Sequence, residues 1–449
     1  MKTKMKTYKI LLFCFTIIGL NTLSAQNPII RNQFSADPTA RVFNDKVYLY
    51  PSHDILAKEG QGRVGWFCME DYHVFSSVNL TDWTDHGVIV SQNKVPWVKP
   101  DSYSMWAPDC AFKNGKYYFY FPAPAKDTIY GRGFSIGVAV SDNPYGPFIP
   151  EPTPIKNVHG IDPCLFIDKG GQAYLYWAAR NIYVAKLKDN MTELASEGQA
   201  IANLPDKGLK EGPFVFERNG IYYLTYPHVQ NKTECLEYAM SNSPLGPFKV
   251  AGVIMDETPN CWTNHQSFIN LKGQWYLFYH SNDLSPNFDK NRSVRIDSMF
   301  FNADGTIRKV IPTLRGVGLT DASSPAQIDR YSSISDKGVS VVFNDTLNTF
   351  GGWKTQFNSK DAWIQYNGVD FGKKKFKTIV VKAISKAGGN LQLRLNNANG
   401  PIVAKLAISK GEEWQTLKLP VSGLKSGIQN LVVSSADNSV VEVDWISFE

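Results

Sequence analysis

The chain has 449 residues, which exceeds one ordinary domain and is enough to bury a large core. Its formal net charge is +6, but residues 1–25 hold four lysines and no acid, so the remainder carries only +2. No basic stripe is left to favour nucleic-acid binding. Beyond residue 25 there are five widely spaced cysteines and no CxxC motif, which argues against a zinc site and allows at most two disulfides.

Residues 1–25 have the pattern of a secretory signal peptide. Lysine-rich "MKTKMKTYKI" precedes the short apolar run "LLFCFTIIGL", and "LSAQ" offers small residues for cleavage after Ala25. The apolar run is too short for a stable membrane span, and no other segment approaches about 18 consecutive apolar residues. We therefore expect an exported protein, periplasmic or extracellular, without a membrane span.

A repeat occupies the first two-thirds of the chain. Five segments each combine a polar entrance, an apolar strand, a turn and an aromatic strand, and they read "ADPTARVFNDKVYLY", "APDCAFKNGKYYFY", "IDPCLFIDKGGQAYLY", "EGPFVFERNGIYYLTY" and "NHQSFINLKGQWYLFY". Each segment predicts a β-hairpin. The hairpins end at Tyr50, Tyr120, Tyr176, Tyr226 and Tyr279, and these intervals leave room for about four short strands per unit. Such a period in an all-β chain predicts a five-bladed β-propeller.

The remaining segments suggest where the domains end. "SDNPYGPF" (141–148) and "SNSPLGPF" (241–248) repeat each other after strands and predict turns on the outer edge of two blades. We expect the propeller over residues 26–315 and a linker over 316–328, where Gly, Ser and Pro accumulate. Residues 329–449 contain short strands at regular spacing, such as "TIVVKAI" and "VVEVDWISF", which is typical of a β-sandwich.

The hairpin entrances carry residues suited to chemistry. They hold Asp37, Asp109, Asp162, Glu211 and His265. A single acid at such a position can be a turn former. In a propeller, however, the innermost strands all start at the axis, and like charges in one pocket raise each other's pKa. Separate acid and base roles are the known use of such a cluster, and two carboxyls flanking a bond are what glycoside hydrolysis needs.

The entrance motifs "ADPTARVF", "WAPDCAF", "GIDPCLF" and "KEGPFVF" follow one another, one per blade. As a set they resemble the family 43 glycoside hydrolases, which are five-bladed propeller arabinofuranosidases and β-xylosidases. The resemblance implies that Asp37 is the general base that activates water and that Glu211 is the general acid. It implies that Asp162 tunes and orients the acid. The family inverts the anomeric configuration, which implies Asp37 and Glu211 carboxyls about 6.5–9.5 Å apart.

The same resemblance suggests residues around the acids. Arg292, in "NRSVRID", matches a family arginine near the cluster. His265, in "TNHQSF", matches a channel histidine that in several members contacts a calcium ion or its waters, and a hydrogen-bonded histidine without metal is the alternative. No cofactor is expected for the chemistry itself, although a structural Ca²⁺ is an open alternative.

Aromatic side chains are the candidates for sugar contacts. Trp106 precedes the second-blade "APD" and is expected either to form a platform for a sugar or to pack between blades. Phe67, Trp177 and His228 are further candidates for the pocket lining. Asp109 is expected to be structural, because in the register set by Pro38 and Pro108 it falls one residue later than Asp37.

Residues 329–449 resemble a family 6 carbohydrate-binding module. "EEWQTLKLP" places Trp414 where such modules have a cleft tryptophan, and Phe357 stands for the second cleft ring. An asparagine usual near the last aromatic is replaced by Glu442 in "VEVDWISF". Sugar binding and a purely buttressing sandwich are both open.

The expected function is an exo-acting, inverting hydrolase that removes terminal α-L-arabinofuranosyl residues from plant polysaccharide or oligosaccharide. A β-xylosidase or galactosidase on the same scaffold is the alternative, since side loops such as 51–66 and 122–135 decide the sugar. Retaining invertase-like fructosidases have a longer entrance motif and a glutamate-cysteine pair, whereas here Gly212 follows the glutamate. A non-catalytic, lectin-like propeller would tolerate loss of an acid, yet all three acids are present.

Overall fold

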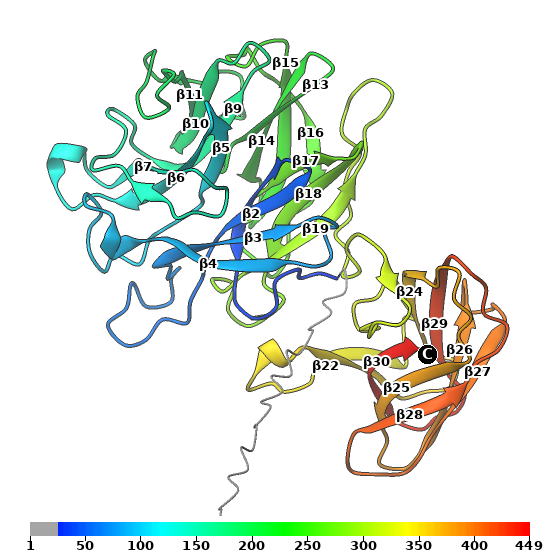
Figure 1. The fold of residues 1–449 in the computed structure, drawn as a ribbon. Coiled ribbons are helices and arrows are strands. Elements are labelled where there is room, and N and C mark those ends of the chain that lie inside the picture. Colours follow the sequence, from blue (N-terminus) through cyan, green and yellow to red (C-terminus); the bar gives the residue numbers. More distant parts are fainter. Residues whose placement is uncertain (1–25) are drawn as a thin grey trace, which may run out of the picture.

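The computed structural model describes residues 26–449, so the predicted signal peptide lies outside the described residues. The chain forms two β-rich domains that lie side by side, the larger one built from the first part of the chain (Figure 1). Among the described residues, the helical segments are single 3₁₀ turns. Two lie in the larger domain, η1 (Gln92–Lys94) and η2 (Thr128–Tyr130), and one lies in the smaller domain, η3 (Thr349–Gly351).

Five antiparallel sheets form the first domain, each one a blade. Blade 1 contains β1 (Ala36–Phe43), β2 (Lys46–Ser52), β3 (Asp71–Ser77) and β4 (Thr84–Ser91). Blade 2 contains β5 (Asp109–Lys113), β6 (Lys116–Pro124), β7 (Phe134–Ser141) and β8 (Ile149–Pro150). Blade 3 contains β9 (Ile161–Ile167), β10 (Ala173–Ala179), β11 (Asn181–Lys186) and β12 (Gln199–Ala200). Blade 4 contains β13 (Phe214–Arg218), β14 (Ile221–Val229), β15 (Glu234–Ser241) and β16 (Lys249–Met255). Blade 5 contains β17 (Ser267–Leu271), β18 (Gln274–Ser281) and β19 (Ser293–Met299).

The innermost strand of every blade is the first strand of a predicted hairpin. Strands β1, β5, β9, β13 and β17 contact one another in ring order, and β1 also contacts β17, which closes the ring. The predicted five-bladed propeller is thereby confirmed. Residues ahead of β1 add to the closure, since the backbone N–H of Ile29 donates to the carbonyl of Val294 (2.9 Å) and that of Ser35 to Arg292 (3.0 Å).

The repeated tyrosines have a structural role between blades. Tyr50 is fully buried, and its hydroxyl donates to the carbonyl of Pro144 at 2.5 Å. Tyr176 makes the same bond to the carbonyl of Pro244. Both prolines belong to the repeated turns 141–148 and 241–248, which follow the third strands of their blades and lead to the fourth. Each of these two tyrosines therefore ties its blade to the edge turn of the next one.

Two facing sheets form the second domain. One contains β20 (Thr320–Asp321), β21 (Ser333–Ile334), β24 (Trp363–Asp370), β26 (Gly389–Leu395), β27 (Ile402–Ile408) and β29 (Ile428–Ser435). The other contains β22 (Val339–Phe343), β23 (Trp353–Phe357), β25 (Thr378–Ile384), β28 (Gln415–Pro420) and β30 (Val441–Phe448). Alternating apolar residues from both sheets meet in one core, which confirms the β-sandwich.

The segment expected to be a linker, residues 316–328, packs against the second domain in the structure. Strand β20 pairs in parallel with β24, and Ala322, Ala326 and Ile328 are buried in the sandwich core. The Gly, Ser and Pro content of this stretch reflects tight turns that bring short apolar residues into the core. It therefore belongs to the second domain.

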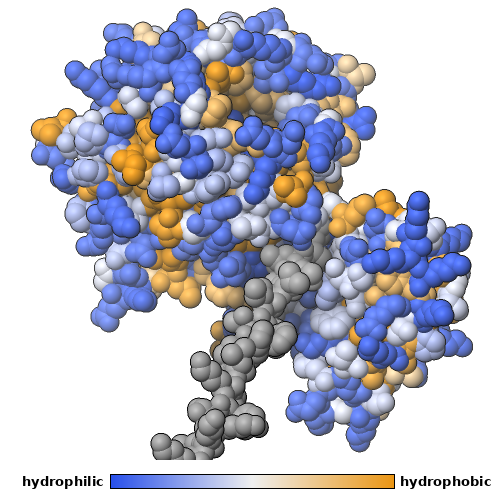
Figure 2. All heavy atoms as spheres, viewed as in Figure 1, coloured by the Kyte–Doolittle hydropathy of each residue, from blue (hydrophilic) through white to orange (hydrophobic). Residues whose placement is uncertain are grey.

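The two domains share a small apolar interface. Phe34 and Leu284 of the propeller form one buried cluster with Trp353 of β23. The amide of Gln26 donates to the hydroxyl of Tyr366 in the sandwich at 2.7 Å. The surface that faces the viewer in Figure 2 is mostly hydrophilic over both domains, with scattered hydrophobic residues. Within residues 26–449, no helix has the length and apolar character needed to cross a membrane.

Candidate active site

Asp37 and Asp162 occupy equivalent, strained positions at the entrances of β1 and β9. Both have positive φ, 43° and 56°, which is rare for residues other than glycine. Both are followed by proline, and the ladder between the first two strands changes register beside each one. A bulge of this kind re-aims a side chain, here toward the propeller axis, at a cost of about 1–3 kcal/mol per residue.

The carboxylate of Asp37 is held on both sides. Nη1 of Arg292 donates to Oδ1 at 2.7 Å, and the Ser52 hydroxyl donates to Oδ2 at 2.7 Å. Burial alone would raise the pKa of Asp37, but the Arg292 guanidinium, together with the other groups around the carboxylate such as the Ser52 hydroxyl, lowers this pKa to about 2. Asp37 is therefore ionised at neutral pH, the state that a base requires.

Two further groups fix this arrangement. Both carboxylate oxygens of Asp54 accept bonds from Arg292, from Nε and Nη2 at 2.9 Å each, so the guanidinium cannot turn away from Asp37. The backbone N–H of Asp37 donates to Nδ1 of His280 (3.1 Å), and Nε2 of that ring lies 3.0 Å from the carbonyl of Thr263. Burial lowers the pKa of His280 to about 3, so the ring is neutral, with its proton on Nε2.

Glu211 and Asp162 have the opposite electrostatics. Burial raises the pKa of Glu211, and the Asp37 charge raises it further. Burial, followed by repulsion from Glu211, raises the pKa of Asp162 well above its usual value. The two are connected through the chain, because the backbone N–H of Gly212 donates to Oδ2 of Asp162 at 2.9 Å. The cluster thus contains one ionised carboxylate and a pair that favours protonation, a separation suited to acid and base roles.

These acids line a cavity of about 140 Å³ at one end of the propeller axis. All five blades contribute to its wall: Asp37, Trp66, Phe67, Met69, Trp106, Ala107, Ile161, Asp162, Glu211, Trp262, Thr263, Asn264, His265 and Arg292. The predicted residues Phe67, Trp106, His265 and Arg292 are therefore brought together with the three acids. The rings of Phe67 and Trp106 meet edge to face, with centroids 6.3 Å apart.

Three predicted sugar contacts need correction. Trp177 is buried between blades 2 and 3 and stacks on Tyr183, because its position on β10 faces the neighbouring sheet. His228 lies outside the cavity and bonds to Glu237. Phe357 is fully buried in the core of the sandwich, so it cannot stack on a sugar. Trp177 and Phe357 both occupy strand positions whose side chains point into a hydrophobic core, which explains these two errors.

Sequence patterns did not reveal several site residues. Asp54 follows β2 in "YPSHD", and Glu234 begins β15, which is the third strand of its blade. Neither lies at a hairpin entrance, where the repeat directed attention. Trp66 and Trp262 come from loops, which the repeat does not describe. The two acids of β15, Glu234 and Glu237, lie in a strand that is otherwise mostly apolar, and this was the available signal.

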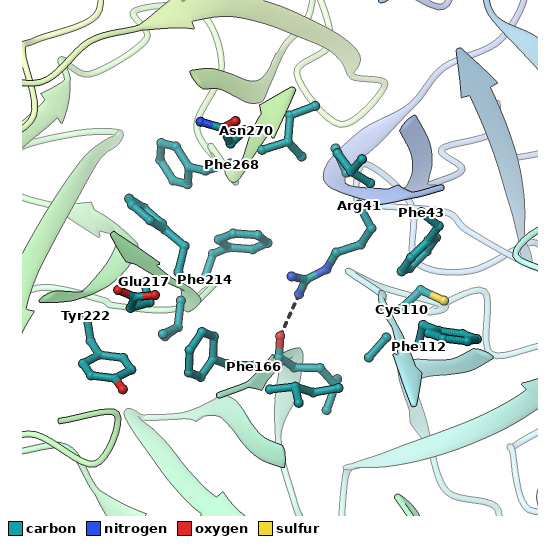
Figure 3. Close-up of a pocket in the computed structure, with 18 of the residues that line it drawn as sticks. Arg41, Phe43, Cys110, Phe112, Phe166, Phe214, Glu217, Tyr222, Phe268 and Asn270 are labelled. Carbon is teal, nitrogen blue, oxygen red and sulfur yellow. Dashed lines mark hydrogen bonds between the residues drawn. The ribbon is translucent and has the colours of Figure 1, made fainter. Parts of the chain in front are cut away.

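The opposite end of the axis holds a larger cavity, about 510 Å³, with different chemistry. Arg41 reaches across it and donates to the carbonyl of Leu165, among aromatic rings (Figure 3). Asp109 accepts two bonds from Arg41, at 2.9 and 2.5 Å, and one from the backbone N–H of Leu165 at 2.6 Å. Asp109 is therefore structural, as expected, and this end lacks a cluster of free acids.

The residues near His265 do not fit a protein-built calcium site. Ca²⁺ takes six to eight oxygen ligands. The acid nearest to the His265 ring is Asp37, with Nδ1 3.9 Å from Oδ1, and this carboxylate already binds Arg292 and Ser52. In the described part of the chain, one group of three possible ligands is His53, Asp71 and His73, and there both rings bond to carboxylates, His53 to Asp71 and His73 to Asp85.

The sandwich presents one predicted ring to solvent. Trp414 is 36% exposed and lies beside the ammonium groups of Lys354 and Lys382, which are 6.0 and 5.6 Å from its ring centre. Lys354 bonds to Glu442, the residue that departs from the family pattern, at 2.8 Å. Of the two predicted cleft rings, Trp414 and Phe357, only Trp414 is accessible, and charged side chains flank it.

An ionised base, a pair of acids whose raised pKa values favour protonation, and aromatic walls around a small cavity define a glycoside-hydrolysing active site. The chain belongs to the glycosyl hydrolases family 43, whose profile matches residues 25–307, and residues 333–449 match the carbohydrate binding module (family 6). The protein is therefore a glycosidase with an appended module of that type.

Individual relatives cover one or both domains. A xylosidase/arabinosidase of Humicola insolens is 38% identical over 329 residues, 62% of this chain and 98% of its own length. An arabinoxylan arabinofuranohydrolase of Bacillus subtilis is 27% identical over 88% of this chain and 86% of its own. The crystal structure of a β-xylosidase/α-arabinofuranosidase from a compost metagenome, solved with xylotriose, is 34% identical, with a TM-score of 0.57 over 64% of this chain and 97% of that one.

Proposed function

We propose that this protein is an exo-acting, inverting glycosidase that removes terminal α-L-arabinofuranosyl residues from plant cell-wall polysaccharide or oligosaccharide. The observation that carries the proposal is the cavity, about 140 Å³, in which Asp37, Glu211 and Asp162 meet. An engineered cavity of about 150 Å³ holds one benzene ring. A site of this size has room for one sugar ring, which favours the end of a chain over its middle.

The mechanism is a single displacement. Asp37 accepts a proton from water while the water oxygen forms a bond to the anomeric carbon. Glu211 gives its proton to the glycosidic oxygen as the bond between that oxygen and the anomeric carbon breaks. Asp162, tied to the backbone of Gly212, holds Glu211 in place, and Arg292 keeps Asp37 ionised. We expect the Asp37 and Glu211 carboxyls to be about 6.5–9.5 Å apart, with room for the water.

β-Xylosidase activity is the second candidate. It is favoured by the similarity to a xylosidase/arabinosidase and to a β-xylosidase/α-arabinofuranosidase, whose names carry both activities. Either sugar would be the terminal unit of a hemicellulose.

The deciding experiment compares nitrophenyl α-L-arabinofuranoside, β-D-xyloside and β-D-galactoside, and follows the anomer released first by NMR. We expect the highest kcat/KM on the arabinofuranoside, with inversion. Asp37→Asn and Glu211→Gln should each lower turnover on natural oligosaccharides by about 10³-fold with the fold intact. Retention of configuration, or near-normal turnover of the Asp37 variant, would overturn the mechanism. A higher kcat/KM on the xyloside would establish the second candidate.

For the module, we propose that Trp414 contacts polysaccharide. Affinity electrophoresis on arabinoxylan should show retarded migration of the wild-type protein and loss of that retardation in Trp414→Ala, while hydrolysis of small substrates stays unchanged. Normal migration of the wild type would leave the sandwich as a buttress. We further propose that the protein is exported after cleavage near Ala25 and that no metal takes part in the chemistry, so that EDTA leaves turnover unchanged.

A further inference from the structure

Glu234 is a buried acid close to the site that the mechanism above does not use. It is the first residue of β15 and is fully buried outside the cavity wall. Its Oε2 accepts a bond from the backbone N–H of Asn264 at 2.6 Å, and its own N–H donates to the carbonyl of Trp262 at 3.0 Å. Both partners belong to the loop that lines the cavity ahead of β17. Glu234 therefore joins blade 4 to the blade 5 wall of the site.

The other carboxyl oxygen of Glu234 has no hydrogen-bond donor among the described residues, and a second acid, Glu211, is close to this side chain. This oxygen, Oε1, is buried, and the Glu211 carboxyl is close enough to the side chain for each group to shift the pKa of the other. Two ionised carboxylates have no proton to share, since each only accepts hydrogen bonds. The contact is satisfied when one proton lies between the two groups. Arg292 cannot neutralise the two glutamates in place of that proton, because its guanidinium already bonds to Asp37 and Asp54.

We propose that Glu234 is a positioning residue for the general acid: its protonated carboxyl donates a hydrogen bond to Glu211 and holds that side chain toward the glycosidic oxygen. This inference rests on the proposed function, in which Glu211 is the acid. When Glu211 gives its proton to the leaving oxygen, it becomes a carboxylate. The Glu234 hydroxyl then donates to that carboxylate and stabilises the charge that the step creates.

The pKa shifts of the two residues agree with Glu234 as the donor and Glu211 as the acceptor. Burial, followed by the charge of Glu211, raises the pKa of Glu234 well above its usual value, so Glu234 keeps its proton. Burial raises the pKa of Glu211, while the bond from Glu234 lowers it. Glu234 thereby makes the buried Glu211 a stronger acid than burial alone would allow.

The test compares leaving groups. In Glu234→Leu, hydrolysis of a substrate with a poor leaving group, such as a natural disaccharide, should fall about ten-fold or more, the size of a lost bond to a charged group. A dinitrophenyl glycoside, whose leaving group needs little protonation, should change less than about two-fold. The limb of the kcat/KM profile at high pH should also move to higher pH, because Glu211 loses the bond that lowers its pKa. Glu234→Gln, which keeps a donor for Glu211 and an acceptor for Asn264, should restore both readouts.

Controls separate the possible outcomes. Glu237→Gln changes another buried acid of β15, which bonds to His228 and Gln230 away from the cavity, and should leave the leaving-group dependence unchanged. Glu211→Gln must show strong leaving-group dependence, and its absence would overturn the proposed function itself. If Glu211→Gln shows that dependence but Glu234→Leu loses equal activity on both substrates, Glu234 is only structural. If Glu234→Leu does not fold, a loss of ten-fold or more in folded Glu234→Gln overturns the proposal.

Discussion

At the scale of single residues, the carboxyl of Asp162 is the clearest case of stability given up for activity. It is buried beside Glu211 in a backbone conformation with positive φ, and its pKa is raised by burial and by that neighbour. The folded protein therefore keeps a proton on Asp162 that the unfolded chain releases above about pH 4. The free energy of unfolding falls as the pH rises from that value toward the raised pKa.

Asp162→Asn should accordingly stabilise the fold and impair the reaction. The amide keeps an oxygen for the Gly212 N–H and carries no charge at any pH. We expect a higher melting temperature than wild type at pH 7.5 and a smaller difference at pH 4.5. Turnover should be lower by roughly 10²-fold, because Glu211 loses the neighbouring carboxyl that the proposed mechanism uses. Calorimetry at the two pH values with parallel assays checks this. A gain in stability that does not grow with pH would contradict the titration argument.

At the scale of elements, the innermost strands are joined by Arg41 and Asp109 at the end of the channel opposite the acids. Arg41 of β1 bonds to Asp109 of β5 and to the carbonyl of Leu165 in β9, so one side chain connects three blades. Its guanidinium also lies 4.7 Å from the ring centre of Phe214 in β13. The ring of strands is thus held at one end by a charge pair in which Asp109 is buried and Arg41 partly buried, and the other end is free for chemistry.

Asp109→Ala should destabilise the propeller by about 3–5 kcal/mol, because it leaves the Arg41 charge without its partner. Turnover of the folded protein should stay within about two-fold of wild type, since the cavity with the acids lies at the other end. Urea unfolding at fixed pH measures the first quantity. Asp142→Ala, which removes an exposed pair with Lys116 in the same blade, is the control and should cost less than about 1 kcal/mol. Equal effects of the two variants would refute the role of the pair.

At the scale of the whole molecule, Trp353 is an apolar link between propeller and sandwich. It is buried against Phe34 and Leu284, stacks on Phe343 and lies 3.8 Å from the Arg330 guanidinium. Contacts of this kind make two domains unfold together when the interface is apolar.

Trp353→Ala should remove that coupling. We expect a loss of about 3–5 kcal/mol and a calorimetric trace that splits into two transitions, one for each domain. Trp414→Ala is the matched control in the same domain, because its ring is exposed, and its melting temperature should equal that of wild type. A single, unshifted transition in Trp353→Ala would show that the domains are coupled elsewhere.

Much of this molecule could be predicted from local patterns. The five hairpins, their closing tyrosines and the acids at their entrances are set by short-range alternation and turn residues, and the propeller follows from the period of the repeat. Asp37, Asp162 and Glu211 could be found because the same entrance recurs in each blade. Residues 316–328 were interpreted as a linker because Gly, Ser and Pro mark tight turns beside a core as well as linkers.

The sequence by itself determined the architecture and the acids, because both depend on residues close together in the chain. Only the tertiary structure decided which side chains share the site: Asp54 against Arg292, Glu234 against Glu211, and Trp177 and Phe357 in cores rather than at a sugar. These contacts join residues far apart in sequence, and whether a strand residue faces a cavity or a neighbouring sheet depends on how the blades pack. The protonation of each acid is decided at the same level, since it follows from burial and from the charges that folding brings near.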